Sequence, residues 1–287
     1  MIKPPLAACG KEDTLHGLIR SNLGDLQADH ELLSTAVDEA GAIARRYFRA
    51  DPKSWEKEPG QIVTEADIAI DRSLHTLITT ERPNDGWLSE ERRDDGSRSQ
   101  CQRVWVVDPI DGTRSFANGV AEFTISIALM MDGQPVLASV SNPITMEHFE
   151  ATLGGGAWLN GTRITPSKLP VIVGYSLLAS WTEMKKRRWQ ELMPEASFTT
   201  IGSLAYKLAL VAAGRYSGLV SLRSCSDWDI AAAVLILKEA GAVISDGRGQ
   251  SIQLNQSTLR HAGLVAAGAE PLYTALINRL ETIRSSK

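Results

Sequence analysis

The sequence lacks the features of a disulfide-bonded or membrane-spanning protein. Its 287 residues include only three cysteines, Cys9, Cys101 and Cys225, which are far apart and odd in number. Such cysteines argue against a disulfide framework and favour a reducing compartment, so we expect a cytoplasmic protein. No apolar run approaches the roughly 18 residues that a membrane-spanning helix requires. We therefore expect no membrane association.

An excess of positive charge is also missing. The formal net charge is −4 and the isoelectric point about 5.8, whereas nucleic-acid-binding proteins usually carry a basic stripe. One short basic cluster, Lys185-Lys186-Arg187-Arg188, is interpreted as a solvated helix face. We therefore expect no nucleic-acid partner. The hydrophobic fraction of 43% is that of an ordinary globular protein, and the length allows one large domain or two coupled halves.

Apolar periodicity predicts helices first and an antiparallel sheet after them. Residues 14–49 fit two helices, and a further helix is expected from the capping box Thr64–Asp67 to Pro83. A β-rich run at 104–107 is expected to end at Asp108-Pro109. Turn signals then predict two hairpins, 123–131 with 135–141 around Asp132-Gly133, and 147–153 with 162–165 around Asn160-Gly161.

The second half of the chain alternates strands with helices, which is typical of a layered α/β architecture. We predict an N-terminal α+β half over residues 14–165 and a C-terminal α/β half over 166–287, joined near Pro166 and Pro170. The elements expected in the second half are strands at 175–179, 217–222, 242–245 and 263–267, and helices from 183 and at 203–213, 228–240 and 270–284.

The segment Asp108-Pro109-Ile110-Asp111-Gly112-Thr113 carries the strongest chemical signal. An apolar strand runs directly into two carboxylates and a hydroxyl. Pro109 fixes its own φ angle, and Gly112 permits an unusual backbone angle or the close approach of a ligand. Mg²⁺ pairs one or two carboxylates with the phosphate oxygens of a substrate. The segment therefore suits a magnesium site, although Asp-Pro and Asp-Gly are also common turn formers.

Three further acidic positions change the balance between these interpretations. Asp67 and Asp229 each lie where a helix begins, and Glu90-Glu91 follows the apolar pair Trp87-Leu88. Taken singly, the two aspartates could favour a helix dipole and the glutamates could lie in a solvated loop. The order of all the motifs together is far more specific than any one of them.

That order resembles the inositol monophosphatase family, a superfamily of Mg²⁺-dependent, often lithium-sensitive phosphatases. The resemblance extends over roughly residues 30–280. It is carried by Val63-Thr-Glu-Ala-Asp67, Glu90-Glu91, Asp108-Pro-Ile-Asp-Gly-Thr113 with Phe116, and Trp228-Asp-Ile-Ala-Ala232 continuing to Glu239-Ala-Gly241. It implies a layered α+β and α/β fold, the five-layer αβαβα sandwich of the inositol monophosphatase and fructose-1,6-bisphosphatase type. It also implies a homodimer.

The resemblance further implies a site for two to three Mg²⁺ ions. Glu90, Asp108 and the carbonyl of Ile110 would bind the first ion, and Asp108, Asp111 and Asp229 the second. A third, weaker ion would share Glu90, with Asp67 nearby through water. Asp67 and Thr113 would orient and deprotonate the attacking water, and the amides of Gly112 and Thr113 would receive phosphate oxygens.

The remaining residues fit such a hydrolysis by metal-activated water. A phosphomonoester dianion repels hydroxide, and bound cations screen that charge, stabilise the leaving alkoxide and lower the pKa of a bound water. No covalent nucleophile is required, and Cys225 has no neighbouring histidine. The five histidines lie outside the motifs and are interpreted as structural or surface residues: His16, His30, His75, His148 and His261.

The substrate is less clearly indicated. Ser203 and Lys207 open a helix that could seat an anion, although a capped helix with an exposed lysine explains them equally well. Arg223 lies where animal members of the family carry an acidic residue that contacts inositol, and it could serve a substrate or pair with a surface acid. We rank a small inositol-like phosphate ester first. The alternatives are 3′(2′),5′-bisphosphate nucleotidase, histidinol-phosphate phosphatase, and a regulatory interaction protein with residual phosphatase activity.

Overall fold

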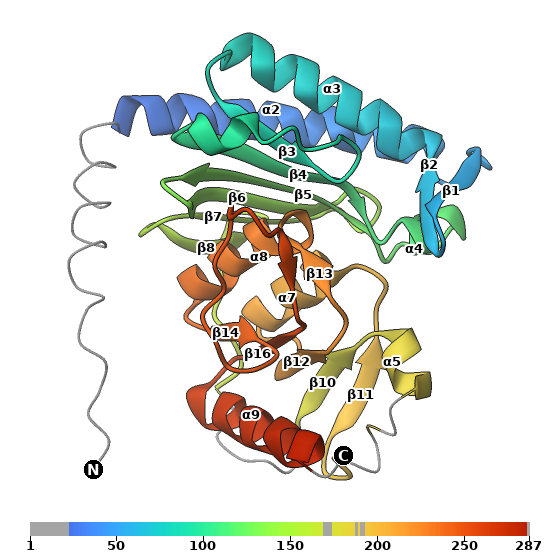
Figure 1. The fold of residues 1–287 in the computed structure, drawn as a ribbon, viewed down its shortest axis with the longest axis vertical. Coiled ribbons are helices and arrows are strands. Elements are labelled where there is room, and N and C mark those ends of the chain that lie inside the picture. Colours follow the sequence, from blue (N-terminus) through green and yellow to red (C-terminus); the bar gives the residue numbers. More distant parts are fainter. Residues whose placement is uncertain (1–22, 169–173, 187–188, 190–192, 286–287) are drawn as a thin grey trace.

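The computed structural model describes residues 23–168, 174–186, 189 and 193–285. Its helices and two sheets stack in five layers (Figure 1). The helices α2 (Leu23–Tyr47) and α3 (Glu65–Glu81) cover the outer face of the first sheet. Helices α7 (Leu204–Ala212) and α8 (Asp227–Ala240) lie between the two sheets, and α9 (Glu270–Ser285) covers the second. The predicted αβαβα sandwich is confirmed.

The first sheet has seven strands in the order β3-β4-β5-β6-β7-β8-β9. Strand β3 pairs with β4 in parallel, and all the other neighbours are antiparallel. The strands are β3 (Gly86–Ser89), β4 (Arg103–Asp111), β5 (Thr124–Met131), β6 (Gln134–Asn142), β7 (Glu147–Thr152), β8 (Gly156–Leu159) and β9 (Thr162–Arg163).

The second sheet has five strands in the order β11-β10-β12-β16-β14. Its strands are β10 (Ser176–Ala179), β11 (Ser197–Thr200), β12 (Gly218–Ser221), β14 (Val243–Asp246) and β16 (Leu264–Ala267). Two ribbons stand apart from the sheets, β1 (Ser54–Glu58) with β2 (Gln61–Thr64) and β13 (Cys225–Ser226) with β15 (Arg260–His261). The short helices are η1 (Ser97–Gln100), α4 (Thr113–Ala117) and α5 (Trp181–Lys186).

The hydrophobic core lies on both faces of the first sheet. In β4, Val104 and Val106 join the apolar cluster on the α7 and α8 side, whereas Trp105 and Val107 join the cluster on the α2 and α3 side. This alternation follows from the two-residue period of a strand. Helix α8 is buried along residues 230–237 because it is enclosed between the two sheets. Among the described residues no helix has both the length and the apolar character needed to cross a membrane.

Several elements differ from their sequence-based predictions. The strand expected to end at Asp108 continues to Asp111, because an irregularity in the β4–β5 ladder between those residues accommodates Pro109, which has no backbone N–H. Two helices were predicted over residues 14–49, but the single helix α2 spans Leu23–Tyr47, and residues 14–22 fall outside the described part. Strand β8 was missed, and the Asn160-Gly161 turn joins it to β9.

Other predictions are confirmed. The capping box at Thr64 starts α3, and Asp132-Gly133 joins β5 to β6. The division at residue 165 stays a prediction. The first sheet ends at Arg163 and the second begins at Ser176, but α8 from the second half packs against β4, β5 and β6 of the first. The two halves therefore share one core.

Candidate active site

Three carboxylates converge where β4 ends and α8 begins. Asp108 and Asp111 belong to β4 and Asp229 to the first turn of α8, and each has an oxygen within 4.8 Å of an oxygen of the other two. Asp108 is only 1% exposed. Its Oδ1 accepts a hydrogen bond from the backbone N–H of Ile110 at 3.1 Å, but its buried Oδ2 has no hydrogen-bond partner. A buried carboxylate oxygen without a partner is costly unless a cation binds it.

The other two carboxylates are held in place by the starts of helices. Asp111 Oδ2 accepts hydrogen bonds from Ser203 Oγ and the backbone N–H of Ala205, both at 2.5 Å. Asp229 completes a capping box, in which its Oδ2 accepts from the backbone N–H of Ser226 at 2.6 Å. The first turns of α7 and α8 thus fix two of the three carboxylates.

Burial and mutual repulsion raise the pKa values of the three carboxyl groups, because too little positive charge compensates them. Burial first, and then the charges of Glu90, Asp111 and Asp229, raise the pKa of Asp108 well above its usual range. Burial and the charge of Asp111 raise the pKa of Asp229 to about 8. Burial also raises the pKa of Asp111 to about 6, although the bonds from Ser203 and Ala205 oppose the shift. An oxygen-only donor set of this charge fits a hard divalent cation such as Mg²⁺.

Asp67 and Thr113 form a hydrogen-bonded pair beside this cluster. The hydroxyl of Thr113 lies 3.1 Å from Asp67 Oδ1 and 3.0 Å from the carbonyl oxygen of Ile110, and it can donate to either. Asp67 Oδ2 accepts from the backbone N–H of Thr64 at 2.8 Å and from its hydroxyl at 2.5 Å. Burial raises the pKa of Asp67 to about 6, so this carboxyl group is ionised at neutral pH.

Gly112 lies between the carboxylates and this pair in a left-handed conformation, with a φ of +94°. A Cβ atom at this position would lie 2.9 Å from the carbonyl oxygen of Glu122 and 3.1 Å from the backbone nitrogen of Ser203. Both the angle and the close approach therefore require glycine. Its predicted contact with a phosphate through the backbone N–H stays a prediction.

Glu90 and Glu91 are tied to the β1–β2 ribbon by a lysine. The Lys57 ammonium donates to Glu90 Oε1 at 2.9 Å and to Glu91 Oε1 at 2.7 Å. Burial lowers the pKa of Lys57, but the charges of both glutamates outweigh this effect, and the net pKa is raised. Glu90 lies outside the group of three carboxylates, yet it lines the same cavity as Asp108.

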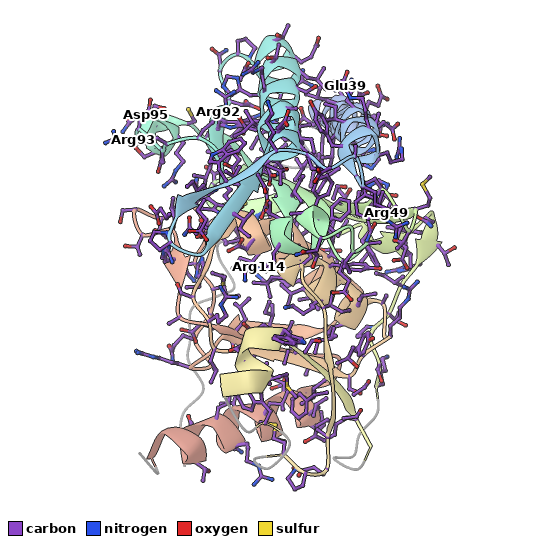
Figure 2. All side chains as sticks on the ribbon, turned by 90° about the vertical axis from the view of Figure 1, so that its right-hand side faces the viewer. Glu39, Arg49, Arg92, Arg93, Asp95 and Arg114 are labelled. Atoms are coloured by element: carbon purple, nitrogen blue, oxygen red, sulfur yellow. The ribbon has the colours of Figure 1, made fainter. Side chains whose placement is uncertain are left out.

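A cavity of about 1,060 Å³ brings most of the predicted site residues together. The predicted residues that line it are Glu90, Asp108, Ile110, Asp111, Gly112, Thr113, Arg223 and Asp229. Sequence reasoning missed Trp181, Glu122 and Arg114, for which no motif gave a signal. Arg114 comes from α4 and donates to the carbonyl oxygen of Gly60 at 3.2 Å, next to the β1–β2 ribbon (Figure 2).

Ser203 and Lys207 do not line this cavity, so the structure shows no substrate contact for either. Ser203 Oγ accepts from the backbone N–H of Tyr206 at 2.9 Å and donates to Asp111. Asp111 thus occupies the start of α7, where an anion seat was expected. Lys207 is buried rather than exposed, and burial lowers its pKa against the opposing charges of Asp111 and Glu183. The interpretation of Lys207 as an exposed residue on a capped helix is wrong.

The described histidines have ordinary structural partners, as expected. His261 Nε2 lies 2.6 Å from Asp227 Oδ1, His148 Nε2 lies 2.9 Å from Ser139 Oγ, and His30 Nε2 lies 3.4 Å from Glu150 Oε2. The ring of His75 packs edge-on against Trp87. His16 falls outside the described residues.

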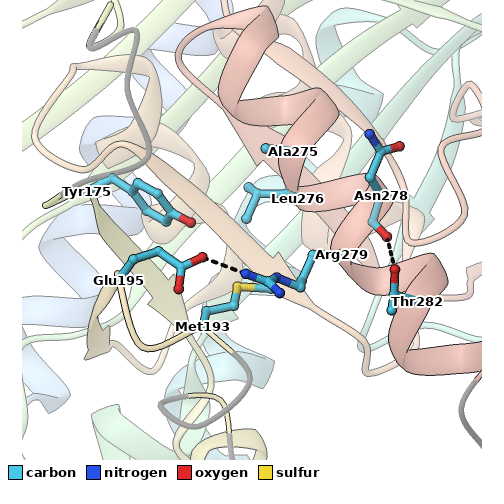
Figure 3. A pocket seen from close by; sticks show the side chains of 8 residues that line it. All are labelled: Tyr175, Met193, Glu195, Ala275, Leu276, Asn278, Arg279 and Thr282. Carbon is cyan, nitrogen blue, oxygen red and sulfur yellow. Dashed lines mark hydrogen bonds and ion pairs between the residues drawn. The ribbon is translucent and has the colours of Figure 1, made fainter.

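A second cavity, of about 270 Å³, lies beside α9 (Figure 3). Its lining includes Tyr175, Glu195 and Arg279. Glu195 Oε1 and the Arg279 guanidinium form an ion pair at 2.9 Å. These charges already satisfy each other, so this cavity is not a candidate for the catalytic site.

Comparisons with known proteins agree with the fold and the site. A model of the inositol monophosphatase family matches residues 25–285. The inositol-1-monophosphatase of Mesorhizobium japonicum is 33% identical over 240 residues, which are 80% of this chain and 87% of that protein. The Nus factor SuhB of Escherichia coli (strain K12) is 33% identical over 235 residues, which are 77% of this chain and 86% of that protein.

The solved structure of the Thermotoga maritima IMPase superposes with a TM-score of 0.79 at 26% identity, covering 91% of this chain and 98% of that one. These likenesses assign the chain to the phosphatases that share this fold. The chain belongs to the inositol monophosphatase family, and the resemblance carried by its sequence motifs is confirmed.

Proposed function

We propose that the chain is a Mg²⁺-dependent phosphomonoesterase that hydrolyses a small phosphate ester. The observation that carries this proposal is the group of three carboxylates, Asp108, Asp111 and Asp229, together with the buried Oδ2 of Asp108, which has no hydrogen-bond partner. These residues would hold the ions, with Glu90 and the carbonyl of Ile110 on the same cavity wall. When bound, Mg²⁺ supplies positive charge for the phosphate and the leaving oxygen and lowers the pKa of water.

The protein groups beside the cluster suit general-base catalysis. Ionised Asp67 can accept the proton of the Thr113 hydroxyl, which leaves the lone pairs of Thr113 Oγ available to a water. As that water attacks phosphorus, its proton passes to Thr113 Oγ, and the proton of Thr113 passes to Asp67 Oδ1. The hydrogen bonds from Thr64 hold Asp67 in position during this transfer.

A substrate panel with Mg²⁺ tests the proposal. Inositol 1-phosphate, histidinol phosphate, adenosine 3′,5′-bisphosphate and fructose 1,6-bisphosphate cover the candidate ester classes. We expect release of inorganic phosphate from at least one of them. Hydrolysis of none, by a folded protein that binds Mg²⁺, would contradict the enzymatic proposal.

A regulatory role is the second candidate function. It is favoured by the similarity to a relative that is named as a Nus factor. The intact carboxylate cluster argues against a protein that has lost catalysis, because repelling buried carboxylates destabilise the fold unless cations bind. Turnover of a generic phosphomonoester separates the two roles.

We also propose lithium sensitivity, a homodimer and a cytoplasmic location, because the family resemblance and the sparse cysteines favour them. Inhibition by LiCl in the phosphate-release assay tests the first. The molar mass from light scattering tests the second, with twice 31.2 kDa expected. Cell fractionation tests the third.

A further inference from the structure

A further carboxylate lies in the first turn of α8, outside the catalytic cavity. Asp227 is the first residue of the helix, two residues before the proposed metal ligand Asp229, and it is fully buried. It does not line the cavity and does not belong to the group of three carboxylates that could hold a cation. An additional buried negative charge next to a cluster that already repels itself is costly unless protein groups bind its oxygens.

Both oxygens of Asp227 are bound by one segment, residues 255–261. Oδ1 lies 2.6 Å from His261 Nε2, and Oδ2 accepts from the backbone N–H of Asn255 at 2.6 Å. Since a carboxylate only accepts hydrogen bonds, the imidazole N–H donates the first of these. The backbone N–H of Asp227 donates in turn to the carbonyl oxygen of Leu259 at 3.0 Å. The segment therefore holds the start of α8 at three points.

The segment is itself fixed by Arg98, which belongs to η1 in the first half of the chain. Asn255 has a φ of +57°, a left-handed conformation that asparagine adopts more readily than most residues. Its side-chain oxygen accepts from the Arg98 guanidinium, which is buried. Arg98 also donates to the carbonyl oxygen of Gln256 and to Asp94 Oδ2, both at 3.0 Å. This buried, charge-assisted contact makes the segment a firm support for α8.

The support matters for the metal site because Asp229 lies in the same helical turn. Asp229 Oδ2 accepts from the backbone N–H of Ser226 at 2.6 Å. That bond fixes the carboxylate relative to α8, but it does not fix α8 relative to β4. Asp111 and Glu90 repel Asp229, and this repulsion acts to push the start of the helix away from β4. The bonds to Asp227 oppose that displacement.

We infer that Asp227, held by His261 and by the backbone N–H of Asn255, is a positioning residue that determines where Asp229 meets the metal ion. This inference rests on the proposed metal site and extends it to residues that do not line the cavity. Groups that orient a metal ligand from outside typically contribute about ten- to a hundredfold to metal affinity. The role therefore predicts a change in the affinity for Mg²⁺ and not only a change in stability.

Calorimetric titration of the metal-free protein with Mg²⁺ tests the inference without substrate or turnover. His261→Phe removes the hydrogen bond to Asp227 and keeps a planar ring, so Mg²⁺ affinity should fall about ten- to a hundredfold. His261→Gln should restore most of the affinity, because its side-chain N–H can donate to the same oxygen. His148→Phe is the matched control, since His148 bonds Ser139 on β6, and it should keep the wild-type affinity.

A double-mutant cycle separates positioning from a general loss of stability. Asp229→Asn removes the charge of the ligand that His261 is inferred to position. In that background, His261→Phe should change the remaining Mg²⁺ affinity by less than about twofold, because the two residues act through one interaction. A purely structural role would lower the affinity equally in both backgrounds. Circular dichroism and thermal unfolding check that each variant is folded at the temperature of the titration.

The outcomes distinguish this inference from the proposed function. Wild-type Mg²⁺ affinity in folded His261→Phe, or equal losses in the two backgrounds, overturns the positioning role and leaves the phosphatase proposal intact. If His261→Phe does not fold, Asp227→Asn takes its place in the cycle. It keeps the shape but can no longer accept both hydrogen bonds, and the same results would support or overturn the role. Absence of Mg²⁺ binding by the wild-type protein overturns the positioning role and the proposed function together.

Discussion

The hydroxyl of Ser203 donates a hydrogen bond to Asp111 Oδ2 over 2.5 Å. This contact joins the end of β4 to the first turn of α7, and the backbone N–H of Ala205 reinforces it. The same serine oxygen accepts from the N–H of Tyr206 and so caps α7. The Ser203 side chain thus both caps α7 and orients Asp111, a proposed metal ligand.

Ser203→Ala should therefore weaken both the helix and the metal site. Loss of the cap costs about 1 kcal/mol of unfolding free energy, and loss of a bond that orients a ligand weakens metal binding about ten- to a hundredfold. Thermal unfolding and calorimetric Mg²⁺ titration measure the two effects. Ser73→Ala is the control, because the Ser73 hydroxyl bonds Glu39 on another part of the surface. Wild-type Mg²⁺ affinity in Ser203→Ala would show that Asp111 does not depend on this bond.

Asp111→Asn should lose activity by roughly a hundredfold or more. Removing the charge of a metal ligand should weaken the metal site more than removing a hydrogen bond that only orients the ligand. The shape is conserved, and the amide oxygen can still accept from Ser203 and Ala205. Removing one charge relieves repulsion in the metal-free cluster, so the metal-free variant should melt no lower than metal-free wild type. Near-normal turnover would mean that Asp111 is not a ligand.

Thr113→Val tests the proposed proton relay. The substitution removes the hydroxyl that links Asp67 to the water and keeps the branched shape, so kcat should fall about 10²- to 10⁴-fold. Mg²⁺ affinity should change little, because no metal ligand is altered. Thr145→Val, which removes a hydroxyl bonded to Glu147, serves as the control. An unchanged kcat would remove Thr113 from the mechanism.

The stability of the metal-free protein should fall as pH rises. Above about pH 4 these carboxyl groups are ionised in the unfolded chain, whereas the folded protein keeps protons up to a pKa of about 6 on Asp67 and Asp111 and of about 8 on Asp229. The folded state therefore binds more protons, and the free energy of unfolding decreases as the pH rises from about 4 to about 8. Saturating Mg²⁺ should abolish the decrease.

Urea unfolding at a series of pH values, with and without Mg²⁺, measures this dependence. Asp229→Asn should flatten the part of the curve between about pH 6 and pH 8, because the carboxyl group with a pKa of about 8 is gone. A metal-free stability that rises over this range would show that the carboxylates do not repel one another.

The sequence predicts the carboxylate cluster better than the substrate contacts, for a physical reason. Asp108 and Asp111 follow an apolar strand and Asp229 begins an apolar helix, so burial of both elements carries the carboxylates inward. Lys207 was harder to place, since the alternation of strands and helices does not show that α7 is enclosed between two sheets. Its burial arises from that packing rather than from any local motif.

The boundaries of the elements also differ in whether a local motif or the packing of the whole fold determines them. The capping box at Thr64 is a local signal, and α3 starts where it predicts. The extension of β4 past Pro109 depends on its pairing with β5, where an irregularity accommodates the missing N–H. Trp181 could not be assigned to the cavity at all, because only the stacking of the two sheets brings α5 to it.

Phosphate release with and without chelator tests the central claim most directly. The same purified protein is assayed on inositol 1-phosphate and adenosine 3′,5′-bisphosphate in excess EDTA and then after Mg²⁺ is restored in excess. The account predicts no release with EDTA, full recovery with Mg²⁺, and poor support by Ca²⁺, which tolerates looser geometry. Full activity in excess EDTA would contradict catalysis at the Asp108, Asp111 and Asp229 cluster.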